Sequence, residues 1–206
     1  MNSAKAIVKQ FLELTENKQD KEALELYLKE QNSFFVAFEL TTDNFEFHSN
    51  IVIPMLFKYS ESAIAYTEAI RILEIELTLA EAVIIMNGGT NIPTHCGRLI
   101  SELERLYTDT GLYNNALAMT DKILSMADDK DTEAIVYNNK AYIYKLMNNK
   151  TAAIKSAKKA ISILKELKQQ DNRMYSNCQE IIADIKGKSK KNNLFEKTYL
   201  FPKYIE

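Results

Sequence analysis

Apolar residues recur every three or four positions along most of the chain, which is the spacing of one face of an α-helix. The first such stretch starts after Ser3 and ends before the polar turn 17–20, and a second covers residues 21–32. Serine and aspartate are favoured at helix starts, so Ser3 and Asp20 are the predicted caps. Because a short turn brings consecutive helices back antiparallel, we expect a helical hairpin here.

The next segment, residues 33–40, is almost wholly apolar. Composition alone would allow a buried strand, but no partner strand is evident, so a buried helix is favoured. Residues 45–59 predict a further helix with Pro54 inside it. Proline lacks a backbone N–H and crowds the preceding turn, so we expect a kink or a helix boundary near Pro54.

Between Ser60 and Asn87 the chain contains neither glycine nor proline. We expect two helices there, with a tight join near 76–78. The following stretch, 87–93, holds adjacent glycines and a proline and is the strongest break in the chain. A phosphate-binding loop is conceivable because adjacent glycines expose backbone N–H groups, but the lysine and hydroxyl residue of a P-loop are missing. A plain loop is favoured, with Thr94 as the cap of the next helix.

The clearest pattern is one spacing of small and aromatic residues that occurs twice between Gly97 and Leu167. The first set comprises Ile100, Glu104, Tyr107, Ala116, Thr120 and Ile123, and the second comprises Tyr137, Ala141, Tyr144, Ala153, Ala157 and Ala160. Small residues let two antiparallel helices cross closely, while the aromatic residues fill the gap to a neighbouring unit. Gly111 and the pair 148–149 supply the turns within the two hairpins.

This spacing resembles the tetratricopeptide repeat (TPR) family, with the best match over residues 97–167, although Glu104 and Thr120 depart from the family's usual residues. The resemblance implies an all-α chain forming a short α-solenoid of antiparallel hairpins, and we expect about nine helices in a right-handed array. An ordinary helical bundle with alanine-rich contacts is the alternative.

Three regions follow from this interpretation. Residues 1–93 are expected to form degenerate or non-repeat hairpins, and 94–186 the TPR-like repeats with a closing helix that starts at Arg173. Residues 187–206 combine a basic linker with an apolar tail. A tail that apolar is expected to dock on its own chain, on a second copy to form a homodimer, or on a partner.

Charge is distributed unevenly along the 206 residues, with net values of −7 for 1–96, −3 for 97–129 and +8 for 130–206. The basic C-terminal part suggests an acidic partner or head-to-tail contact between copies. A lysine-rich face exposed only to solvent is the alternative. The small numbers of glycine (5) and proline (3) agree with an all-α chain.

No constellation of catalytic residues stands out, so we expect no enzyme activity and no cofactor. Cys96 and Cys178 have no pairing motif, and His95 and His48 do not provide the ligand spacing of a zinc site, so no metal is expected. The first residues lack the continuous apolar core of a signal peptide, and no apolar run is long enough to cross a membrane. We therefore expect a cytoplasmic protein.

The TPR resemblance also implies a concave peptide-binding face. The predicted peptide-binding residues are Arg98, Ser101, Arg105, Asn138, Asn139, Tyr142, Lys145, Arg173 and Asn177. TPR proteins that hold the C-terminal carboxylate of heat-shock chaperones use a similar set, which Asn139 and Arg173 match, whereas Ser101, Arg105 and Asn177 replace other members. Chaperone-tail binding is therefore not implied, but the basic residues favour an acidic or carboxylate-bearing peptide.

From these features we expect a non-catalytic protein- or peptide-binding scaffold or adaptor whose partner is an acidic protein or peptide. One alternative resembles the TPR domains of bacterial peptide-pheromone sensors, as a regulatory receptor without a DNA-binding domain of its own. A second alternative is nucleic-acid binding through the basic C-terminal half, although no aromatic–basic motif supports it.

Overall fold

The computed structural model describes residues 2–37, 42–86, 88 and 96–187. Within these ranges all regular structure is helical and no strand occurs, which confirms the predicted all-α class. Three consecutive elements form one continuous helix from residue 42 to 59, so the described residues form nine continuous helices, as predicted. None of the helices in the described part of the chain is long and apolar enough to cross a membrane.

The chain divides into two compact units, residues 1–99 and 100–206. This division lies six residues after the predicted boundary at residue 93 and falls inside α6 (Cys96–Asp109).

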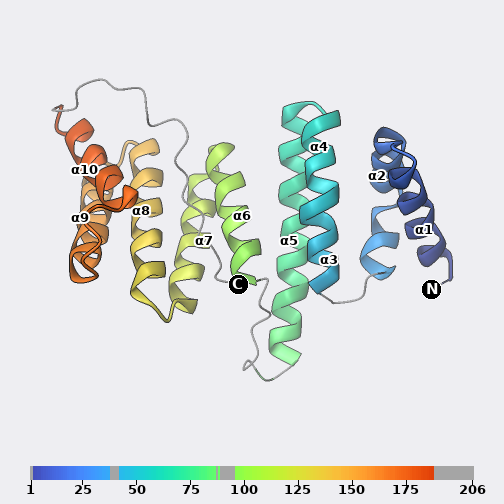
Figure 1. Cartoon of the computed structure of the whole chain (residues 1–206), viewed down its shortest axis with the longest axis horizontal. Coiled ribbons are helices and arrows are strands. Elements are labelled where there is room, and N and C mark those ends of the chain that lie inside the picture. The colour runs from blue at the N-terminus through green and yellow to red at the C-terminus, as the bar shows by residue number, and fades with distance from the viewer. Residues whose placement is uncertain (1, 38–41, 87, 89–95, 188–206) are drawn as a thin grey trace. The chain divides into compact units, whose positions relative to one another are not determined.

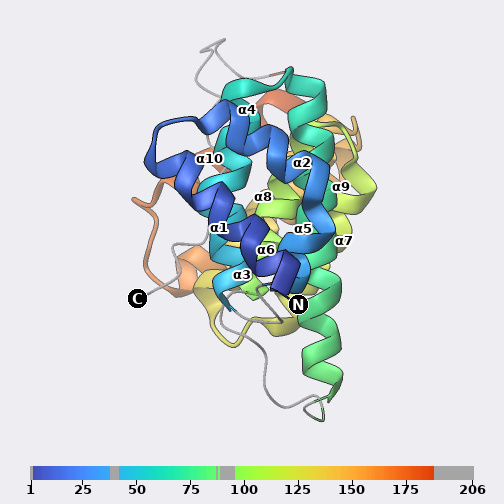
Figure 2. The same cartoon turned by 90° about the vertical axis from the view of Figure 1, so that its right-hand side faces the viewer.

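The first unit contains five α-helices and one π-helical segment. They are α1 (Asn2–Glu16), α2 (Asp20–Ala37), α3 (Thr42–Phe47), η1 (His48–Val52), α4 (Ile53–Tyr59) and α5 (Ser62–Met86). Helices α1 and α2 pack side by side, as Figure 1 and Figure 2 both show, and confirm the predicted hairpin. Lys18 in their turn adopts φ 61°, and the Gln19 amide closes the end of α1 by donating to the Leu14 carbonyl at 2.9 Å.

Helix α2 is longer than the sequence pattern predicts. It leaves helical geometry at Glu30, where φ is −118° and ψ is 25°, and then resumes to Ala37. The part beyond this kink includes the apolar segment for which a buried helix was favoured over a strand, and Phe34 within it is fully buried. Helix is therefore confirmed for residues 33–37, and residues 38–40 lie outside the described residues.

The geometry of the backbone changes immediately before Pro54, as expected. Residues 48–52 form a π-helical turn, and the Ile53 amide donates to the carbonyl of His48 five residues earlier. Pro54 has no N–H to continue an α-helical ladder, and its ring would crowd the carbonyl of Asn50. The wider turn is a common way for a helix to accommodate such a break. It also sets the position of His48.

The predicted join at residues 76–78 is wrong, because α5 is one helix of 25 residues (Figure 1). The polar side chains at this point have hydrogen-bond partners in the continuous helix or beside it. The Thr78 hydroxyl donates to the Glu74 carbonyl at 2.9 Å, and the Glu76 carboxylate bonds to His48. With neither glycine nor proline in the stretch, nothing interrupts the helical hydrogen bonds.

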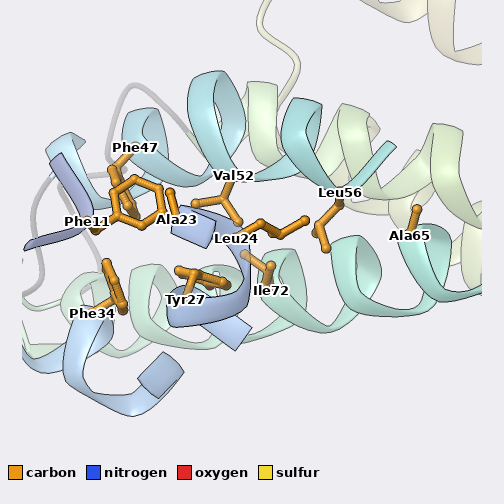
Figure 3. Packing of buried hydrophobic residues seen from close by; sticks show 10 residues of the cluster. All are labelled: Phe11, Ala23, Leu24, Tyr27, Phe34, Phe47, Val52, Leu56, Ala65 and Ile72. Carbon is orange, nitrogen blue, oxygen red and sulfur yellow. The ribbon is translucent and has the colours of Figure 1, made fainter. Parts of the chain in front are cut away.

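Aromatic rings dominate the core of the first unit. The ring centroids of Phe11 and Phe34 lie 5.4 Å apart in an edge-to-face arrangement, and Phe34 stacks on Phe47 at 5.7 Å. Figure 3 shows these three rings gathered together, with the side chains of Leu56 and Ala65 farther along the same core. Aromatic pairs at these separations contribute about 0.5–1.5 kcal/mol beyond their buried area.

The second unit contains most of α6 and four further helices. These are α7 (Tyr113–Met126), α8 (Lys130–Leu146), α9 (Lys150–Glu166) and α10 (Arg173–Ile185). The predicted turns at Gly111 and Asn148 are confirmed, and both residues have positive φ values, 78° and 57°. In each turn the next amide donates back five residues, as Leu112 does to the Tyr107 carbonyl at 2.8 Å, which satisfies an otherwise free helix-end carbonyl.

Small residues dominate the contact between α8 and α9. Ala141, Ala153, Ala157 and Ala160 are fully buried in one cluster, with Tyr137 and Tyr144 packed against it. The first set of the repeated spacing is buried as well, including the two residues that depart from the family pattern. The predicted close crossing of the second hairpin is therefore confirmed, while stacking of repeats into a solenoid stays a prediction.

Helix α10 packs on both α8 and α9. Its buried side chains are Met174, Cys178 and Ile181, whereas Arg173, Ser176 and Gln179 on the opposite side are exposed. A polar outer face is typical of a helix that closes a repeat array, so the exposed polar side chains of α10 agree with its predicted closing role. The loop 87–93 apart from Gly88, the Thr94 cap and the tail 188–206 lie outside the described residues, and the predictions for them stay predictions.

Candidate functional site

Three of the predicted groove residues lie where α8 contacts α10. The Cys178 thiol donates to Asn138 Oδ1 at 3.4 Å, and Lys145 Nζ donates to Asp184 Oδ2 at 2.6 Å. Tyr142 packs against the cluster that also contains Cys178. These side chains join the two helices to each other, so they serve the packing of the second unit.

Asn138 and two further predicted residues are buried. Asn138 and Asn139 are each 4% exposed and are joined by a bond from Asn138 Nδ2 to Asn139 Oδ1 at 3.3 Å. Ser101 on α6 is 3% exposed. Side chains this deeply buried present little surface to an incoming peptide.

The positive charge expected in the groove is largely paired within the chain. Arg105 on α6 is only partly exposed and bonds to Glu102 at 3.2 Å and to Asp109 at 3.0 Å. Lys145 is paired with Asp184. An acidic peptide at either position would have to displace a carboxylate that is already bound, so these two residues attract anions less than the sequence suggested.

The remaining predicted residues are more accessible but are not brought together. Arg98 belongs to the first unit, where its guanidinium bonds to Asn50 Oδ1 at 3.2 Å and lies 5.5 Å from the Phe45 ring centroid. Arg173 is exposed and Asn177 is partly exposed on α10. The described residues therefore do not show Arg98, Arg173 and Asn177 as one common peptide-binding surface.

A more accessible charged feature lies on the outer face of α9. Five side chains on this face are exposed, and they follow one another at intervals of four, three, four and three residues. They are Thr151, Lys155, Lys158, Ser162 and Lys165. The opposite face carries the buried alanines of the α8–α9 contact. We call Lys155, Lys158 and Lys165 the α9 lysine stripe; in the described residues none of the three is paired with an acidic group.

Two other lysines around α9 differ from the stripe because carboxylates neutralise them. Lys159 pairs with Glu133 at 3.4 Å, and Lys130 pairs with Glu166, whose bond raises the pKa of Lys130 and lowers that of Glu166. The stripe therefore carries surplus positive charge at the surface of the second unit. The alternation of alanine and lysine in residues 152–160 could have revealed it from sequence, since the alanines fix which face is outward.

A different polar group is buried inside the first unit. His48 is 0% and Glu76 is 4% exposed, and His48 Nδ1 lies 2.7 Å from Glu76 Oε1. The imidazole stacks on Phe35 with 4.7 Å between centroids, and Tyr27 and Phe47 contact it edge-on. A histidine–carboxylate pair can take part in acid–base chemistry, but rings enclose this one, so no reactant in solution meets it in the described arrangement.

Comparisons with known proteins do not assign this geometry to a family. No protein-family model matches the chain, and a search of curated proteins finds no match to it. The functional argument therefore depends on the residues themselves. Among the described residues, the α9 lysine stripe is the accessible feature with the clearest chemical preference.

Proposed function

We propose that this chain is a non-catalytic adaptor, built on TPR-like hairpins, that binds an acidic protein segment along the α9 lysine stripe. The observation that carries the proposal is that Lys155, Lys158 and Lys165 are exposed and that none of them has an acidic partner among the described residues. Two neighbouring lysines, Lys130 and Lys159, are already neutralised by carboxylates, and a partner that supplies carboxylates would neutralise the stripe in the same way.

The geometry of the stripe suits an extended or helical acidic segment. Lys155 and Lys165 are ten residues apart in one helix, which corresponds to about 15 Å along its axis. An extended chain covers that length with about five residues. Because the stripe is exposed and polar, binding would depend on charge, and we expect it to weaken steeply as salt is added.

The proposal moves the binding surface from the side of α8 that contacts α10 to the outer side of α9. On the TPR resemblance this outer side belongs to the second helix of a repeat, which forms the convex face. The predicted groove residues support this move, because those that lie together are occupied in contacts within the unit.

The test uses a fluorescent ten-residue peptide of glutamate and serine, with binding measured by fluorescence anisotropy at low and at physiological salt. The triple variant Lys155→Glu, Lys158→Glu, Lys165→Glu should bind at least about tenfold more weakly than the parent, since three favourable contacts become repulsive. The matched control changes three exposed lysines of the first unit to glutamate, Lys5, Lys21 and Lys29, with the same change in net charge.

If both triple variants lose affinity equally, the effect is one of net charge and the stripe is not the site. The same titration with a single-stranded oligonucleotide tests the alternative partner. Tighter binding of the oligonucleotide than of the peptide, again lost only in the α9 variant, would replace the acidic protein segment with a nucleic acid. No binding of either probe would leave the stripe as a solvent-exposed face and would contradict the proposal.

A further inference from the structure

The buried polar cluster of the first unit contains two side-chain atoms that find no partner among the described residues. They are the hydroxyl oxygen of Tyr27 and Nε2 of His48. Both residues are 0% exposed, and their ring centroids lie 5.6 Å apart in an edge-to-face arrangement. Leaving a buried polar atom without a hydrogen bond destabilises a fold, so two such atoms in adjacent rings call for an explanation.

The chemistry of the two atoms is complementary to a hydroxyl group. Burial strongly raises the pKa of Tyr27, so its side chain stays a phenol that can donate and accept. His48 Nδ1 is already engaged by Glu76, which leaves Nε2 as the free end of the ring. Nε2 accepts when the ring is neutral and donates when it is protonated, and a water molecule can satisfy either state.

The side chains around Tyr27 and His48 favour a small neutral molecule over an ion. Phe34, Phe35 and Phe47 supply apolar rings around the cluster, and His48 stacks on Phe35 at 4.7 Å. An ionic ligand would lose its hydration without a counter-charge, since the carboxylate of Glu76 is already bonded to His48. Buried waters in proteins typically bridge two to four polar groups of this kind.

We propose that the first unit binds one ordered water between the Tyr27 hydroxyl and His48 Nε2, which extends the Glu76–His48 pair into a continuous hydrogen-bonded chain. The chain would link α2, η1 and α5, and so would hold the π-helical turn against both helices. This inference concerns the first unit alone and is independent of the function proposed for α9.

The direction of the stability change in Tyr27→Phe tests the proposal. If the hydroxyl is bonded through water, its removal should lower the folding equilibrium constant about two- to tenfold, measured by urea unfolding. If the hydroxyl is truly without a partner, the variant should be more stable than the parent, and the proposal is overturned. Tyr66→Phe is the matched control, because the Tyr66 ring packs on Phe57 in the same unit without complete burial.

A double-mutant cycle with His48→Asn asks whether the two atoms share one water. Asparagine keeps an N–H near the position of Nδ1 for Glu76 and removes Nε2. Coupling of at least about twofold between the two substitutions is expected, whereas additive effects would show separate environments and contradict the bridge. A crystal structure of the parent chain that resolves waters provides a readout that does not depend on variants: density within hydrogen-bonding distance of both atoms supports the proposal, and its absence there refutes it.

Discussion

The two units of this chain have cores of opposite character. In the first unit, the buried rings of Phe11, Tyr27, Phe34 and Phe47 come from three different helices. In the second, four alanines from the single hairpin α8–α9 form the contact, and tyrosines close its edges. Large rings fill wide gaps between helices, whereas alanines let two helices approach closely. The comparison shows that loss of volume should harm the first core most, and gain of volume the second.

The largest effect is expected for Phe34→Ala. Removing a fully buried ring leaves a cavity among Phe11, Tyr27 and Phe47, and should lower the free energy of unfolding by about 3–5 kcal/mol. Urea unfolding followed by circular dichroism measures this. Val36→Ala on the same helix is the control, because Val36 is 60% exposed and should change stability by less than about 0.5 kcal/mol. Similar losses in both variants would show that the aromatic cluster is not a packed core.

The next effect concerns added volume in the second unit. Ala153→Leu or Ala141→Leu should force α8 and α9 apart and cost about 1–3 kcal/mol. Ala118→Leu on the exposed side of α7 makes the same chemical change where nothing is crowded, and it should be nearly neutral. Equal stabilities of all three variants would contradict the close crossing of α8 and α9.

The third prediction concerns the pH dependence of stability, which the buried thiol of Cys178 in the alanine cluster should affect. Burial raises the pKa of Cys178 to about 12, above the ordinary thiol value of 9.0. Above pH 9 the unfolded chain loses this proton while the folded chain keeps it, so the contribution of Cys178 to stability is complete below pH 9 and falls as the pH rises toward 12. Between pH 8 and pH 10 the parent should lose about 1 kcal/mol more than Cys178→Ala does. Equal losses in the two proteins would show that the thiol is accessible to water.

The smallest effect concerns residues with positive φ at two helix ends of the second unit. Lys168 follows α9 with φ 57°, a conformation that glycine adopts with less strain. Lys168→Gly should therefore stabilise the chain by about 0.5–1 kcal/mol. Gly111→Ala makes the reverse change at φ 78°, where an added Cβ meets no atom within 4 Å, so it should destabilise through backbone strain alone. Thermal melting of both variants checks the opposite signs.

The same contrast explains which parts of the fold could be predicted from sequence. The alanine contacts lie within one hairpin, so their spacing predicts which residues meet, and Gly111 and Asn148 mark the turns. The aromatic contacts of the first unit join three consecutive helices, α1, α2 and α3, and no repeated spacing in the sequence specifies which rings meet. Pro54 predicted a change in backbone geometry, but not that a π-helical turn would carry His48 into the core.

The errors also have physical causes. A join near residues 76–78 was predicted because two shorter helices fit a solenoid better than one long helix, but Glu76 continues the buried face of α5 with Ile72 and Leu77. A carboxylate on a buried face requires a buried partner, and that requirement was the available signal for His48. For the predicted groove, sequence position identified basic residues but could not show that Glu102, Asp109 and Asp184 pair with them.

The most direct test of the proposed binding surface is an NMR titration of the ¹⁵N-labelled chain with the acidic peptide. We expect the largest chemical-shift changes at Lys155, Lys158 and Lys165 and their neighbours on α9, with small changes at Arg173 and Asn177. The opposite distribution, with changes at Arg173 and Asn177 and none on α9, would return the binding surface to the predicted groove and contradict the proposal that the α9 lysine stripe receives the partner.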